Sequence, residues 1–125
     1  MLERLLLVFA AGGLGTVTRY GLTILVHRQV QTGFPLGILV VNATGCLFFG
    51  LVYALIEERG ILSPQVRLAV LVGFAGAFTT FSTFAFDTAQ LARSSQMLWA
   101  AGNIILNVTL GIALIFAGFA LGRSL

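Results

Sequence analysis

The sequence has few charged side chains, and this scarcity narrows its class. Of its 125 residues, 9% are charged and 58% are hydrophobic, and the mean hydropathy is +1.04. A soluble globular domain carries roughly 25% charged residues, so this chain has too few of them to cover its own surface. The length suits a single domain over residues 1–125. We therefore expect an integral membrane protein.

The sequence is also poor in residues that carry catalytic or metal chemistry. It holds one cysteine, Cys46, and one histidine, His27, which excludes an intrachain disulfide and a Cys/His metal site. Paired carboxylates and a nucleophile with its base are missing as well. Because the sequence has no basic cluster, nucleic acid is not an expected partner. We predict that the chain is not an enzyme and binds no organic cofactor.

Four apolar segments are each close to the roughly 20 residues that cross a bilayer as a helix. They run from about Leu5 to Val26, from Leu36 to Ile56, from just after Pro64 to about Leu91, and from Met97 to Leu121. The short stretches between them hold most of the charges and both prolines. The sequence thus predicts an all-α membrane protein of four transmembrane helices.

The N-terminus also has features of a secretory signal. "MLERLLLVFAAGG" has a short basic start, an apolar run and then small residues. The apolar sequence continues to Val26, however, which is longer than a signal core, and three more spans follow. We therefore expect this segment to stay as the first helix.

The arginines are distributed almost evenly over the two ends of such a bundle. Four spans place both termini on one side, where four arginines fall: Arg4, Arg59, Arg67 and Arg123. The other side holds Arg28 and Arg93, with Arg19 near the end of the first segment. This weak bias is compatible with insertion in either orientation and pairing of two opposite copies, and equally with one fixed orientation.

Polar side chains inside the spans are the candidates for a transport pathway. An amide in hydrocarbon costs several kcal/mol when unpaired, so Asn42 and Asn107 either bond a neighbouring helix or donate to a ligand. Asn103 lies four residues before Asn107, so the two share a helix face. Arg19 either reaches the headgroups or lines a wet vestibule that attracts anions. Asp87 is the one acid well inside an apolar run.

Residues 73–84, "GFAGAFTTFSTF", combine small residues, hydroxyls and aromatic rings. The consecutive threonines Thr79 and Thr80 weaken a helix. A helix break here would free backbone groups at membrane depth, which is tolerated only where they face protein, water or an ion.

Two interpretations of this stretch remain open from the residues alone. Its glycines and rings are typical of a close helix interface. Alternatively, the phenylalanine rings, which recur at Phe78, Phe81 and Phe84, turn their positive edges inward and favour an anion, while Ser82, Thr83 and an asparagine amide donate hydrogen bonds. Such groups would bind an anion strongly enough for entry and weakly enough for exit.

Three motifs in order resemble those of the bacterial Fluc/CrcB fluoride channels, and the resemblance covers almost the whole chain. "GFAGAFTTFSTF" is similar to the hallmark motif of that family's third helix. "GILVVNATGCLFFG" (37–50) resembles its second-helix pattern around a polar asparagine, and "GGLGTVTRY" (12–20) its glycine-rich, arginine-containing first helix.

The resemblance implies a fluoride-selective passive channel that exports cytoplasmic fluoride across the cell inner membrane. It implies an antiparallel, dual-topology homodimer in which each third helix is broken near its middle, with two pores at the interface. It also implies a structural Na⁺ at the dimer centre, held by backbone carbonyls at the helix break, which maps to Gly76 and Thr79.

The resemblance also assigns roles to single residues. Phe81 and Phe84 match the phenylalanines whose ring edges face fluoride, Asn42 matches the pore asparagine, and Arg19 matches the vestibule arginine. Ser82 and Thr83 match hydroxyls of a polar track.

The fourth helix departs from the family pattern. Related channels often have a tyrosine and hydroxyl residues on the pore side there, whereas "GNIILNVTLG" offers Asn103, Asn107 and Thr109. We assign the polar track of this helix to Asn107 and Thr109.

Two other functions fit a small four-span chain. A dual-topology exporter of multiple drugs or cations needs a carboxylate deep in a span, but Glu3, Glu57 and Glu58 are terminal or loop residues, which leaves Asp87. A non-transporting membrane assembly subunit would use the glycines and asparagines only for packing.

Overall fold

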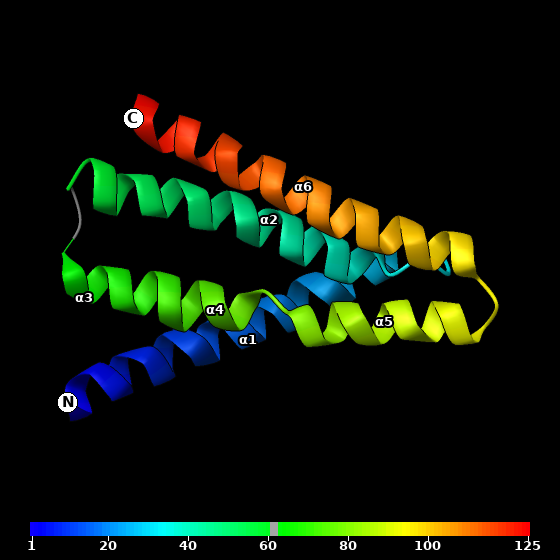
Figure 1. Cartoon of the computed structure of the whole chain (residues 1–125). Coiled ribbons are helices and arrows are strands. Elements are labelled where there is room, and N and C mark those ends of the chain that lie inside the picture. Colours follow the sequence, from blue (N-terminus) through cyan, green and yellow to red (C-terminus); the bar gives the residue numbers. More distant parts are fainter. Residues whose placement is uncertain (61–62) are drawn as a thin grey trace.

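The computed structural model describes residues 1–60 and 63–125, and the elements that it describes are helical. Four helical stretches are long and apolar enough to cross a membrane: Leu2–Gln29, Leu36–Glu58, Pro64–Arg93 and Met97–Ser124. They lie side by side as a bundle, and both termini lie at the same end of it (Figure 1). The prediction of four membrane-spanning helices is therefore confirmed, with bounds that differ by a few residues.

The spans divide into shorter elements. The first is α1 (Leu2–Gln29), and the second is α2 (Leu36–Tyr53) with the π-helical turn η1 (Ala54–Glu58). The third consists of α3 (Pro64–Arg67), the π-helical η2 (Leu68–Ala75), α4 (Gly76–Phe78) and α5 (Phe81–Arg93), and the fourth is α6 (Met97–Ser124). Pro64 lies in the first turn of α3 after Ser63, whose hydroxyl accepts a hydrogen bond from the Val66 N–H at 3.4 Å.

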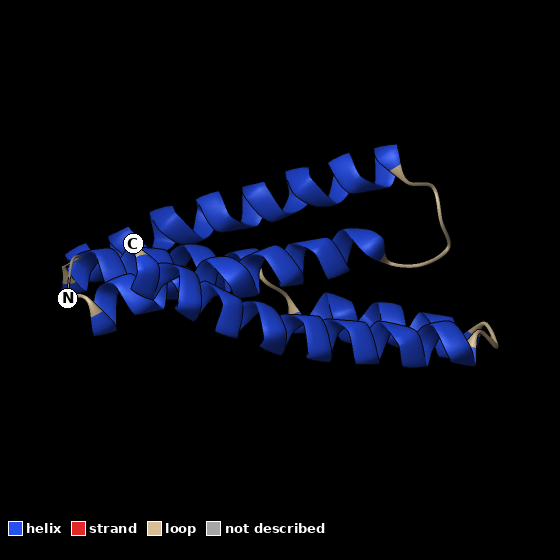
Figure 2. Cartoon of the chain, turned by 90° about the horizontal axis from the view of Figure 1, so that it is seen from above, coloured by secondary structure: helices blue, strands red, loops and turns tan. Residues whose placement is uncertain are grey.

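The third span is broken near its middle, as the sequence predicted. Thr79 (φ −78°, ψ 157°) and Thr80 (φ −149°, ψ 117°) are both extended, which gives the short non-helical link between α4 and α5 (Figure 1; tan in Figure 2). The Thr80 hydroxyl caps α5 by accepting a hydrogen bond from the Thr83 N–H at 3.2 Å. The break thus separates two helical halves, and the second half begins with its own cap.

Glycines let the helices approach closely around this break. A Cβ at Gly118 of α6 would overlap the Leu47 carbonyl oxygen of α2, and one at Gly15 of α1 would overlap the Phe74 carbonyl oxygen of η2. Gly45 of α2 faces the side chain of Thr79 in the same way. Small residues are the usual means of close helix packing in membranes, so α2 lies directly against the break.

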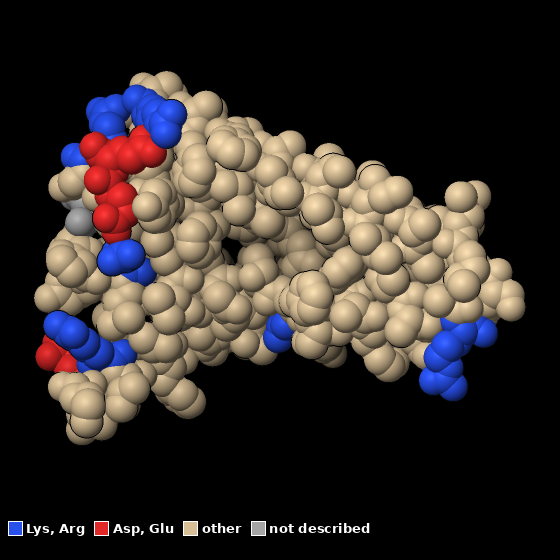
Figure 3. Space-filling view, in the orientation of Figure 1, with Lys and Arg blue, Asp and Glu red and all other residues tan. Residues whose placement is uncertain are grey.

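Charged side chains gather at the end of the bundle that holds both termini (Figure 3). There Arg67 Nε lies 2.7 Å from Glu57 Oε1. The Arg123 guanidinium donates to both carboxylate oxygens of Glu58, at 2.5 and 2.9 Å. The expectation that Glu57 and Glu58 are loop residues is therefore wrong, because they are the last residues of η1, where arginines pair with them at the end of the bundle.

Candidate functional site

A groove of about 400 Å³ opens on the surface of the bundle beside the helix break. Its walls include Asn42 and Cys46 of α2, Thr79 and Thr80 of the break, Phe81 and Phe84 of α5, and Asn107 of α6. Four of these residues are predicted pore residues: Asn42, Phe81, Phe84 and Asn107. The fold brings these four together from three different spans.

The two phenylalanines of the groove differ sharply in exposure. Their ring centroids are 5.6 Å apart with an interplanar angle of 62°, an edge-to-face arrangement. Phe84 is 9% exposed, whereas Phe81 is 79% exposed. A single chain thus leaves one ring of the pair uncovered at membrane depth.

Asn42 binds the backbone of the helix break. Its Oδ1 accepts a hydrogen bond from the Thr80 N–H at 2.9 Å, and its Nδ2 donates to the Thr80 carbonyl oxygen at 3.2 Å. Because the break removes helical partners from Thr80, the Asn42 side chain supplies them. An amide side chain can meet both needs, because its nitrogen donates and its oxygen accepts.

The hydrogen bonds continue from Asn42 into α6 and back to α5. Asn42 Nδ2 donates to Asn107 Oδ1 at 3.0 Å, and Asn107 Nδ2 donates to Asn103 Oδ1 at 2.9 Å. Asn103 Nδ2 then donates to Thr88 Oγ1 at 2.9 Å, and that hydroxyl donates to the Phe84 carbonyl oxygen at 2.8 Å. A continuous polar chain therefore crosses the bundle behind the two rings.

Three members of this chain were not among the predicted site residues: Thr80, Thr88 and Asn103. The spacing of Asn103 and Asn107 placed them on one face of a helix, and this signal could have included Asn103, whose exposure is 1%. The sequence marks Thr80 as a helix breaker that also offers a hydroxyl. Nothing in the sequence marked Thr88.

Arg19 and Thr83 lie together in a second hollow, of about 440 Å³, that Thr16, Tyr20 and Thr23 of α1 also line. Thr83 and Ser82 contact the polar chain through the Thr80 hydroxyl, at 3.1 and 3.3 Å between side-chain oxygens. Arg19 and Thr83 thus line a hollow other than the groove, whereas Ser82 is exposed and is not among the residues that line either one.

Thr109 is not brought to the groove. It is exposed, and its hydroxyl donates to the Ile105 carbonyl oxygen of its own helix at 2.7 Å. The structure does not unite Thr109 with Asn107, and its assignment to the polar track stays a prediction.

Gly76 is the first residue of the short helix α4, and Thr79 directly follows its last. The Thr79 N–H and hydroxyl both donate to the Ala75 carbonyl oxygen at 3.1 Å, while the Thr80 N–H goes to Asn42. The last carbonyls of a helix have no partner within it, and oxygen ligands suit hard cations. Over residues 1–60 and 63–125, no group of three His, Cys, Asp or Glu side chains could hold a metal ion. A cation at this break would therefore fit backbone carbonyls.

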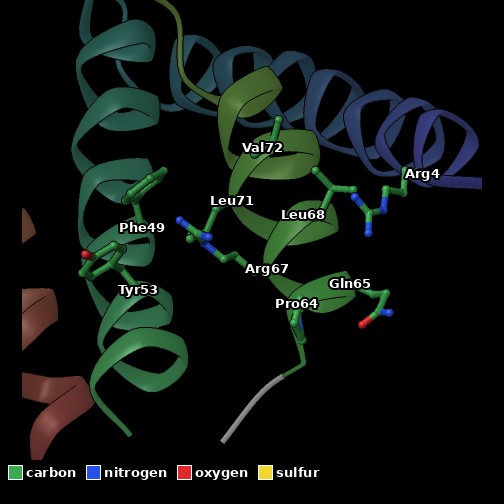
Figure 4. A pocket seen from close by; sticks show the side chains of 9 residues that line it. All are labelled: Arg4, Phe49, Tyr53, Pro64, Gln65, Arg67, Leu68, Leu71 and Val72. Carbon is green, nitrogen blue, oxygen red and sulfur yellow. The ribbon is translucent and has the colours of Figure 1, made fainter. Parts of the chain in front are cut away.

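Two further hollows lie toward the ends of the bundle. Asp87 lines one of about 350 Å³ together with His27 and Gln90. The other, of about 490 Å³, lies between α1, α2 and the start of the third span, with Arg4 and Arg67 at its rim (Figure 4).

The chain is similar to known proteins over nearly its whole length. A family model described as "CrcB-like protein, Camphor Resistance (CrcB)" matches residues 6–119. A protein of Nitrosococcus oceani named "Fluoride-specific ion channel FluC" is 44% identical over 123 residues, which cover 98% of each chain. Proteins of the same name from Maridesulfovibrio salexigens and Paracoccus denitrificans are 46% and 42% identical, over 98% and 100% of this chain and 97% and 98% of their own. By this match over nearly its full length, the chain belongs to the CrcB family.

Proposed function

We propose that the chain forms a fluoride-selective passive channel that exports cytoplasmic fluoride across the cell inner membrane. The observation that carries the proposal is the groove, where two edge-to-face phenylalanines and the amide of Asn42 meet beside a broken helix. The curated relatives that match this chain are named as fluoride-specific channels, a function that needs no catalysis and agrees with the prediction of no enzyme.

The chemistry of the groove suits a small anion. Ring edges carry partial positive charge, and amide N–H groups donate hydrogen bonds. Neither is a full charge, so an anion is attracted without being trapped. Selectivity then rests on Phe81 and Phe84, with Asn42 as the donor that replaces lost hydration.

Two antiparallel copies would complete the pathway. The groove opens on the surface of a single chain, where Phe81 is 79% exposed. It also contains the polar side chains of Asn42 and Asn107, and polar groups at membrane depth need protein or water around them. A second copy that covers the groove supplies that cover, and the nearly even arginine distribution permits opposite insertion. Two-fold symmetry then gives two equivalent grooves, and hence two pores.

A structural Na⁺ at the dimer centre is part of the same proposal. The carbonyls of Gly76 and Thr79 would hold it, because backbone oxygens are the ligands that the break offers. The ion would join the two broken helices and neutralise the carbonyl dipoles that face one another.

The direction of transport follows from acid–base chemistry. Fluoride is the anion of a weak acid, so the neutral acid enters cells and dissociates in a near-neutral cytoplasm. The membrane potential drives the anion outward with about 2.3 kcal/mol per charge per 100 mV. A passive channel suffices for export.

The two alternative functions have less support. A cation exporter needs a carboxylate deep in a span, but Glu57 and Glu58 are paired with arginines at the bundle end, and Asp87 lies in a hollow apart from the groove. An assembly subunit explains the glycine contacts but gives no reason for a groove that joins Asn42 with Phe81 and Phe84.

Efflux from liposomes tests the proposal. Purified protein is reconstituted in vesicles loaded with fluoride or chloride, and efflux is followed with ion-selective electrodes after a potassium ionophore dissipates the voltage. We expect fast fluoride efflux without chloride efflux. A folded, dimeric protein that passes neither anion contradicts the proposed function.

A further inference from the structure

Every hydrogen-bonding atom of the Asn42 amide already has a partner in the groove. One N–H of Nδ2 donates to the Thr80 carbonyl oxygen at 3.2 Å, and the other donates to Asn107 Oδ1 at 3.0 Å. Oδ1 accepts from the Thr80 N–H at 2.9 Å. Since Nδ2 carries two protons, an anion that binds Asn42 has to displace one of these two acceptors.

Backbone groups fix which way the amides point. The Thr80 N–H can only donate, so Asn42 turns its oxygen toward Thr80 and its nitrogen toward Asn107. At the other side, Asn107 Nδ2 donates to the Asn103 carbonyl oxygen at 3.0 Å, which can only accept. A turned amide would set two donors or two acceptors against each other, and buried unpaired groups are costly.

Asn107 is consequently an acceptor toward Asn42. Its nitrogen is held between the carbonyl oxygen and Oδ1 of Asn103, at 3.0 and 2.9 Å. Asn103 is 1% exposed and is held in turn by Thr88. The polar chain thus presents the oxygen of Asn107, and not its N–H groups, to the donor that faces the groove.

We propose that Asn107 adds to the selectivity of the two rings by competing with the anion: its Oδ1 accepts the Asn42 hydrogen bond until an anion displaces it, and Asn103 positions Asn107 for this role. This inference rests on the proposed function. A tethered amide oxygen is a good acceptor, so only an anion with a stronger hydrogen bond replaces it. Fluoride, small and with concentrated charge, accepts more strongly than chloride. The competing oxygen therefore lowers the affinity for chloride more than the affinity for fluoride, and such a difference in affinity is what specificity means.

Replacement of the competing oxygen tests the proposal. The leucine of Asn107→Leu has the same branched shape and number of side-chain heavy atoms but no acceptor, so the Asn42 donor becomes available to any anion. In the liposome assay we expect chloride efflux to rise relative to fluoride efflux by about ten- to hundred-fold, the range that corresponds to one hydrogen bond to a charged group. Thr18→Val serves as the control, because the Thr18 hydroxyl bonds only within α1, and it stays chloride-tight.

A measurement on the unaltered protein does not depend on the folding of that variant. In nanodiscs, NMR resolves the side-chain amide groups of asparagines labelled with ¹⁵N. We expect added fluoride to shift the signals of Asn42 and Asn107 together, because their mutual hydrogen bond breaks, while an equal concentration of chloride shifts neither.

The outcomes separate this inference from the function on which it rests. If the unaltered protein passes no fluoride, the proposed function fails. If it passes fluoride, while folded Asn107→Leu excludes chloride as completely as the unaltered protein does, Asn107 is not a competitor and the inference is wrong. Fluoride that leaves the Asn107 signals unmoved overturns it as well.

Discussion

Asn42 and Thr80 exchange two hydrogen bonds although they are 38 positions apart in the sequence. The Asn42 side chain bonds both the N–H and the carbonyl oxygen of Thr80, at the point where the third span is broken. The same amide reaches Asn107 and faces the groove. The residue proposed to bind the anion therefore also holds the break in shape.

Loss of the Asn42 amide is expected to destabilise the fold. In Asn42→Leu the buried Thr80 N–H has no acceptor, which costs about 1–3 kcal/mol. Thermal unfolding in detergent measures the loss. Thr44→Val on the same helix is the control, since the exposed Thr44 hydroxyl bonds its own helix at the Val40 carbonyl oxygen, and it should change stability by less than about 0.5 kcal/mol. Equal midpoints for both variants would show that Asn42 does not hold the break.

The two rings of the groove are expected to respond differently to substitution. Phe81 is 79% exposed in the single chain, so Phe81→Leu leaves the stability of the subunit near that of the unaltered protein. Its fluoride efflux falls about ten-fold or more, because a ring edge is lost from the pathway. Phe84→Leu, at a buried position, lowers both stability and efflux.

Phe86→Leu is the matched control for both variants, because Phe86 is 62% exposed on the same helix and lies outside the groove lining. It should conduct like the unaltered protein. Normal fluoride efflux in Phe81→Leu would show that this ring is not part of the ion pathway.

Close packing of α2 and α6 is expected to depend on Gly118. The methyl group of Gly118→Ala would overlap the backbone of Leu47 and Leu51, and overpacking of this kind costs about 1–3 kcal/mol. Gly102→Ala on the same helix meets nothing within 4 Å and should be neutral or slightly stabilising. The ratio of folded to aggregated protein after heating, from size-exclusion chromatography, compares the two. A more stable Gly118→Ala would contradict the packing.

The four spans and the break could be predicted because both follow from local sequence. Apolar length defines the spans, and two adjacent threonines among small residues mark the break. The partner of Asn42 could not be predicted, because it is the backbone of Thr80, which has no signature in side-chain chemistry. Which hollow Thr83 faces was also hidden, since it depends on how α5 is rotated after the break.

The assignment of Thr109 to the polar track comes from the family resemblance, and the helical period does not support it. Two residues along a helix are about 200° apart around its axis, so Thr109 points away when Asn107 points inward. The helical period contained this information, but the resemblance to channels with hydroxyls on this helix suggested a role for Thr109.

If the two subunits insert in opposite orientations, a variant that inserts in one orientation only conducts fluoride only together with a variant that inserts in the other. Lysines at Gln31 and Gln96, at one end of the bundle, favour one orientation, and lysines at Gln65 and Ser124, at the other end, favour the reverse. All four residues are exposed. We expect either double variant alone to give little fluoride efflux, and the two expressed together to restore it. Full efflux from each variant alone would argue for parallel subunits.

The central claim is that fluoride passes through the groove of Asn42, Phe81 and Phe84, and the sequence's one cysteine allows a direct measurement. Cys46 lines this groove. We would measure fluoride efflux after complete modification with N-ethylmaleimide, verified by mass spectrometry, in the unaltered protein and in Cys46→Ser. The account predicts that modification stops efflux in the unaltered protein and leaves Cys46→Ser conducting. Unchanged efflux from fully modified protein would place the ion pathway elsewhere.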